Sequence, residues 1–140
     1  MAGCEKRELL AWKSRSLLGC LYEFQRNTEA VCALIVQDDG AILAKVSTAA
    51  DLDIDTLGVF SSMMFATAWV LVRELGARGE ISGRFTIGTD YQLLVMGITP
   101  KAALVALCGT SLGTGLLEYQ ARILVPRMIN CLRQLTSEEQ

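Results

Sequence analysis

The feature that most constrains this chain is a long apolar segment in its middle, residues 56–76 (TLGVFSSMMFATAWVLVRELG). One set of its side chains has the i, i+3, i+4, i+7 spacing of an amphipathic helix and is predicted to face the protein's own sheet. This inner stripe comprises Leu57, Phe60, Met64, Ala68, Leu71, Val72 and Leu75. A second stripe lies roughly opposite and comprises Val59, Met63, Ala66 and Val70, with Phe65 and Trp69 in the angle between the two. A helix that is apolar nearly all round needs cover on two sides, from a membrane, a further layer or a second copy of the chain.

Composition narrows these choices. The chain has 140 residues, of which 51% are hydrophobic, and this predicts one domain over residues 1–140. Its net charge of −2 predicts no positively charged surface that would attract nucleic acid. The uncharged run between Asp55 and Arg73 is barely long enough to span a bilayer and contains serine and threonine, so we predict no membrane insertion. Charge near the start argues against a signal peptide and favours the cytoplasm.

The sequence contains few candidates for catalytic, cofactor-binding or metal-binding residues. The chain has no histidine, and its five cysteines show no paired spacing, which is typical of reduced core thiols. The glycine-rich segment GTSLGTG (residues 109–115) lacks the lysine of a phosphate-binding loop, so Thr110 or Ser111 is predicted to cap the following helix instead. We therefore predict no enzyme activity, no cofactor and no metal site.

The order of elements predicts an α+β fold. A helix over residues 5–27 precedes two strands, 30–37 and 41–47, joined at an Asp-Gly turn, with an interior strand first and an edge strand second. The central helix follows, capped by Asp53 or Asp55. Three strands come next, at residues 84–88, 91–98 and 102–108, and then a last helix in which Pro126 predicts a kink or a break. A hairpin and a three-stranded meander form one five-stranded antiparallel sheet with helices on both faces.

Three stretches in this order resemble the Roadblock / dynein light chain family, as in small-GTPase regulators of the bacterial or archaeal type. They are VCALIVQDDGAILAKVS, the apolar helix ending in RELG with the later strand YQLLVMGI, and ALVALCGTSLGTGLLEYQAR. The resemblance covers roughly residues 8–133. It implies a profilin-like or Roadblock-like layered domain with strand order 2-1-5-4-3, the first and last helices on one face and the central helix on the other. It also implies a homodimer formed through the central helices and third strands, which binds a small Ras-like GTPase without catalysis of its own.

The second stripe is therefore predicted to form the dimer interface together with the third strand. The predicted interface residues are Val59, Met63, Ala66, Trp69, Val70, Arg84 and Thr86. Arg73 and Arg78 are candidate contacts to the GTPase, and with Arg84 they are the candidates for an arginine finger. Two alternatives stay open: a structural adaptor subunit of a motor or multiprotein complex, and a small-molecule sensor domain.

Overall fold

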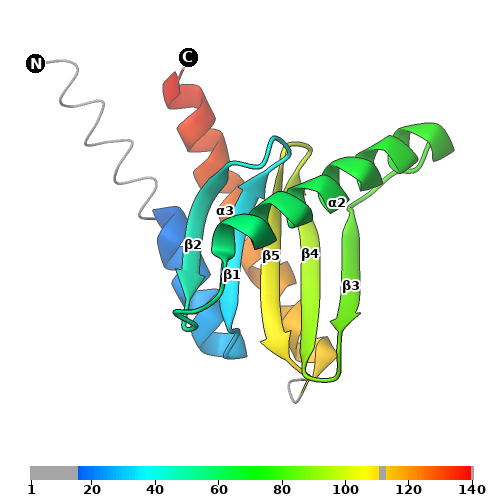
Figure 1. Ribbon diagram of the computed structural model, residues 1–140. Coiled ribbons are helices and arrows are strands. Elements are labelled where there is room, and N and C mark those ends of the chain that lie inside the picture. Colours follow the sequence, from blue (N-terminus) through cyan, green and yellow to red (C-terminus); the bar gives the residue numbers. More distant parts are fainter. Residues whose placement is uncertain (1–15, 111–112, 140) are drawn as a thin grey trace, which may run out of the picture.

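The chain folds into a five-stranded antiparallel sheet with helices on both faces. The computed structural model describes residues 16–110 and 113–139 (Figure 1). The strand order is β2-β1-β5-β4-β3, which confirms the predicted α+β class and topology. After a first helix at residues 16–28 the elements are β1 (Cys32–Gln37), β2 (Ile42–Ser47), α2 (Ile54–Leu75), β3 (Ser82–Ile87), β4 (Tyr91–Thr99), β5 (Ala102–Gly109) and α3 (Thr114–Glu139). The part of the first helix predicted before residue 16 lies outside the described residues.

The hairpin of β1 and β2 turns at Asp39 and Gly40, as predicted. Gly40 has a φ of 97°, which favours glycine, and Asp39 Oδ1 accepts a hydrogen bond from the Ala41 backbone N–H at 3.0 Å. β1 lies between β2 and β5, whereas β2 is an edge strand on which Lys45 is exposed. The prediction of an interior strand followed by an edge strand is confirmed.

Two hydrophobic cores lie on the two faces of the sheet. The first helix and α3 cover one face, and α2 crosses the other (Figure 1). Side chains of β1 alternate between them: Ala33 and Ile35 join the core under the first helix and α3, while Leu34 and Val36 join the core under α2. Both faces of the interior strands are thus buried, which explains their continuous apolar sequence.

The side of α2 that faces the sheet differs from the predicted inner stripe. Phe65 is fully buried under the helix and is 0% exposed. Phe60, Leu71 and Leu75 are exposed instead, so their assignment to the inner stripe is wrong. The helix is rotated so that the angle between the two predicted stripes, where Phe65 lies, faces the sheet.

Small residues explain this rotation. Gly58, Ser61 and Ser62 are the other buried residues of α2, and they let its backbone approach the strands closely. A Cβ on Gly58 would lie 2.9 Å from Ile42 Cδ1 on β2. The Phe65 ring packs against Gly97 on β4, where the absence of a side chain leaves space for it. A Cβ on Gly97 would lie 3.2 Å from Phe65 Cε1. One large side chain surrounded by small ones therefore sets the contact between helix and sheet.

Asp53 caps α2 and gives its stability a defined pH dependence. Its carboxylate accepts hydrogen bonds from the Thr56 hydroxyl at 2.6 Å and the Thr56 backbone N–H at 3.1 Å, and these two bonds lower the pKa of Asp53 below its ordinary value of 3.8. The stabilisation is present above that ordinary value and is lost as the pH falls through the folded-state pKa.

Asp53→Asn keeps an acceptor for the cap but does not titrate. In urea unfolding between pH 2 and pH 7, we expect the wild type to lose stability relative to Asp53→Asn below about pH 4. Two pH profiles that stay parallel would contradict this role of the Asp53 carboxylate.

Pro126 lies inside α3, which continues from Thr114 to Glu139. The predicted break does not occur, because the proline removes one N–H while the surrounding turns still pack on the sheet through Leu124 and Met128. The carbonyl of Arg122, four residues earlier, loses its intrahelical donor.

Pro126→Ala restores that donor, and we expect it to stabilise the protein by roughly 1–3 kcal/mol in thermal or urea unfolding. Asn130→Ala, at an exposed position of the same helix, is the control and should change stability by less. An unchanged or lower stability of Pro126→Ala would show that α3 is adapted to the proline.

Candidate protein interface

An exposed apolar surface extends along α2 and onto the neighbouring edge strand. On α2, Met63 is 57% exposed and Leu75 is 77% exposed. On β3, Phe85 and Ile87 are exposed as well. We call this set the α2–β3 surface; it comprises Val59, Phe60, Met63, Val70, Leu71, Leu75, Phe85 and Ile87. Contiguous apolar surface of this kind usually marks a site of interaction with another molecule.

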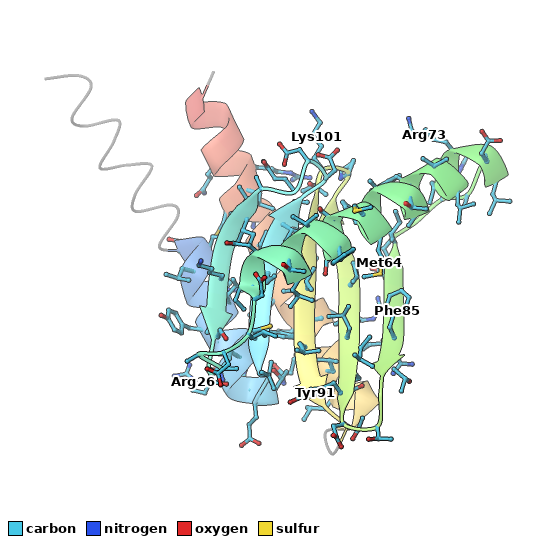
Figure 2. All side chains as sticks on the ribbon, in the orientation of Figure 1. Arg26, Met64, Arg73, Phe85, Tyr91 and Lys101 are labelled. Atoms are coloured by element: carbon cyan, nitrogen blue, oxygen red, sulfur yellow. The ribbon has the colours of Figure 1, made fainter. Side chains whose placement is uncertain are left out.

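The helix and the strand are joined by an apolar groove of about 140 Å³. Figure 2 shows Phe85 on β3 below the part of α2 that carries Met64. The Phe85 ring lies against Gly83, where a Cβ would come within 3.2 Å of Phe85 Cε2. The groove is lined by Met64, Phe65, Ala68, Ile81, Ser82, Gly83, Phe85 and Val95. The helix and the edge strand therefore present one surface.

The alternation of β3 assigns its side chains to two different faces. Arg84 Nε lies 3.2 Å from Glu118 Oε1 on α3, so Arg84 points to the face that α3 covers. Thr86 follows two residues later and points the same way, whereas Phe85 points toward α2. The two predicted strand residues thus lie on the face away from α2. Their backbone still belongs to the open edge of the sheet, because β3 pairs only with β4 among the described strands.

The five predicted helix residues divide into two groups. Three of them are exposed: Val59, Met63 and Val70. The other two, Ala66 and Trp69, are half-buried. Trp69 packs edge-on against Phe65 with ring centroids 6.4 Å apart, and its indole Nε1 is buried without a hydrogen-bond partner among the described residues. Trp69 therefore belongs mainly to the chain's own core.

Sequence reasoning missed five members of the α2–β3 surface. They are Phe60, Leu71, Leu75, Phe85 and Ile87. The three helix residues are apolar in sequence, but so are most residues of α2. Apolar character alone therefore does not indicate which side of the helix faces the sheet. The two strand residues alternate with an arginine and a threonine, which predicts that the two pairs point to opposite faces of the sheet. The sequence does not indicate which pair points toward α2.

Basic side chains lie beside this surface. Figure 2 shows Arg73 near the end of α2 and Lys101 in the turn between β4 and β5. Both side chains line a hollow of about 370 Å³. Asp38 and Trp69 line the same hollow. Arg78 is exposed in the connection from α2 to β3. An apolar centre with charged groups at its margin is the usual composition of a protein–protein interface.

The thiols of Cys32 and Cys108, which lie in the strands of the sheet, are poor nucleophiles. Burial raises the pKa of Cys32 and of Cys108 to about 11, so both thiols stay protonated at neutral pH. In the described residues no group of three or more acidic, cysteine or histidine side chains could hold a metal ion.

The hydroxyl of Thr110 donates to the Thr89 carbonyl at 3.1 Å, and α3 begins at Thr114, so the predicted cap by Thr110 is wrong. Ser111, the other candidate cap, lies outside the described residues.

Within the described part of the chain, α2 is long and apolar enough to cross a membrane by length and composition. Such helices also occur in the cores of soluble proteins. Its side with Gly58, Ser62 and Phe65 is packed on the sheet, and the Thr67 hydroxyl donates to the Met63 carbonyl at 2.8 Å within the helix. The helix is thus one layer of the domain, and its opposite side, which no other described element covers, contributes its apolar residues to the α2–β3 surface.

Comparison with known proteins places this fold. No family model matches the sequence, and no curated protein matches it. Among solved structures, Myxococcus xanthus MglB superposes with a TM-score of 0.80 at 12% identity, covering 87% of this chain and 91% of that chain. A structure described as MglB with tetrameric arrangement gives 0.79 at 19% identity and coverages of 88% and 92%. A Roadblock/LC7 domain from Streptomyces avermitilis gives 0.72 at 15% identity and coverages of 83% and 97%. The chain has the Roadblock/LC7 fold.

Proposed function

We propose that the protein is a homodimer formed through the α2–β3 surface. Two observations carry this proposal: the exposed apolar side chains on α2, and the apolar groove that joins the helix through Met64 and Ala68 to Phe85 on the edge strand β3. A two-fold axis would let α2 pack on α2 of the second copy and let β3 pair with its counterpart. One contact would then cover the exposed apolar side chains of α2 and would also pair the outer edge of β3, which has no partner among the described strands.

The dimer, in this proposal, regulates or scaffolds a small Ras-like GTPase without an active site of its own. Two observations support it: the Roadblock/LC7 fold, and the basic margin formed by Arg73, Arg78 and Lys101. The dimer would bind one arrangement of the switch loops of the GTPase better than the other, which shifts the nucleotide cycle by contact alone. Arg73 and Arg78 are the proposed contacts to the GTPase. Arg84 is the weakest of the three arginine-finger candidates, because it is paired with Glu118.

A pull-down from the cytosol of the native cell tests this function. The tagged wild type is expected to retain a Ras-like GTPase, with a preference for either the GDP state or the GTP-analogue state, and Val70→Arg is expected to retain at least tenfold less. Tyr119→Arg is the matched control, because Tyr119 is a similarly exposed apolar residue on α3, in the opposite layer. Its retention should equal that of the wild type.

Two outcomes would overturn the proposal. Retention of structural subunits alone, with no GTPase, would indicate the adaptor role. Equal retention of the GTPase by the wild type and Val70→Arg would show that GTPase binding does not depend on the α2–β3 surface.

A further inference from the structure

The first helix and α3 pack against each other in an antiparallel register that two contacts define. Arg127 Nη1 lies 2.7 Å from Glu23 Oε2, and Asn27 Nδ2 donates to Gln120 Oε1 at 3.2 Å. Moving backward along the first helix therefore moves forward along α3. One helical turn beyond the pair of Glu23 and Arg127, this register brings residue 20 opposite residue 131.

Both of these positions are cysteines, and both are free thiols. Cys20 is 3% exposed within the core, and Cys131 is half-buried and packs against the same core. Burial raises the pKa of the Cys20 thiol, the neighbouring Cys131 thiol raises it further, and the Arg127 guanidinium opposes both effects. Each sulfur thus lies in the immediate surroundings of the other, beside the ion pair of Arg127 and Glu23.

We propose that Cys20 and Cys131 form a reversible disulfide when a peroxide oxidises the protein. The sulfur of the more accessible Cys131 attacks one peroxide oxygen, the O–O bond breaks, and the thiol proton leaves with the other oxygen, which gives a sulfenic acid and one water. The Cys20 sulfur then attacks the sulfenic sulfur, the S–O bond breaks, and the second water leaves. In total two thiols and one hydrogen peroxide give one disulfide and two waters. An external dithiol returns two electrons and two protons and restores both thiols.

The fold makes this pair different from the other cysteines described. Cys32 lies in the core under α2, and Cys108 lies in the core under the first helix and α3, so the sheet separates them. Both are fully buried in strands, away from a peroxide in solvent. Cys131 combines partial exposure with a neighbouring thiol, and no other described cysteine has both.

The disulfide would tie the second half of α3 to the first helix. It would close a loop from residue 20 to residue 131, and cross-links that close long loops restrict the unfolded chain most. The cross-link lies in the layer opposite the α2–β3 surface, so dimer formation should not depend on it. The redox proposal and the proposed function can therefore fail separately.

The test is peroxide treatment of the full-length wild type, followed by alkylation, proteolysis and mass spectrometry. We expect a peptide pair linked through Cys20 and Cys131. We also expect a melting temperature higher by roughly 5–15 °C that dithiothreitol returns to the starting value. Cys131→Ala should lose both effects, and Cys4→Ser should keep both.

Three results would overturn the proposal. They are oxidation of Cys131 to the sulfinic acid without a cross-link, a cross-link of Cys131 to a cysteine other than Cys20, and full alkylation of both thiols after treatment. The peptide map is read on the wild type, so its result does not depend on how well any variant folds.

Discussion

Met63→Glu is expected to convert the protein from a dimer to a monomer in sedimentation at micromolar concentration. Met63 is near the middle of α2, and in a two-fold pairing of these helices the residue meets the second copy close to the axis. A carboxylate there would be buried in apolar surroundings and would face its own symmetry mate. Since an unpaired buried charge costs several kcal/mol, the dissociation constant should rise at least a hundredfold.

Tyr22→Glu is the matched control for this variant. Tyr22 is 56% exposed on the first helix, in the opposite layer, and should accept the same charge without a change in association. Circular dichroism must show that both variants keep the helical content of the wild type. A wild type that is already monomeric at micromolar concentration, or a Met63→Glu variant with an unchanged dissociation constant, would disprove the interface.

Phe65→Ala should have the largest effect on folding. The ring is fully buried, packs on Trp69, and occupies the room that Gly97 leaves on β4. Removing it leaves a cavity between α2 and the sheet that small neighbours cannot fill, and we expect a loss of about 3–5 kcal/mol in the free energy of unfolding. Urea unfolding followed by circular dichroism measures it.

Phe60→Ala is the control, with the same residue type on the same helix at 59% exposure. It should change the stability of the subunit by no more than about 0.5 kcal/mol. Both variants are best measured in the Met63→Glu background, so that association between subunits does not enter the unfolding curve. Equal losses for the two phenylalanines would mean that α2 is not seated on the sheet as described.

Much of the fold could be predicted from local sequence signals. The Asp39-Gly40 turn between two apolar runs defines a hairpin with short-range chemistry alone. The interior position of β1 follows from its continuous apolar residues, which require cover on both faces. These features depend on residues that are neighbours in the chain, so a single sequence contains them.

The rotation of α2 could not be predicted in this way. Periodicity finds the buried side of a helix only when the other side is polar, and this helix has apolar residues nearly all round. What decides the rotation is close approach at Gly58, Ser61 and Ser62, and that is a property of the helix and sheet together. The same limit applies to β3, where alternation separates Arg84 from Phe85 but does not say which of them faces α2.

Lys45 on the exposed edge of β2 affects whether further strands can add to the sheet and so how large an assembly of this fold could become. If two sheets join at β3, the continuous sheet ends in a copy of β2 on each side. An unprotected edge would accept another strand and lead to open-ended polymers, and a charged lysine on a short edge strand is a common protection against such growth. In that arrangement a single side chain would terminate strand addition and keep the particle finite.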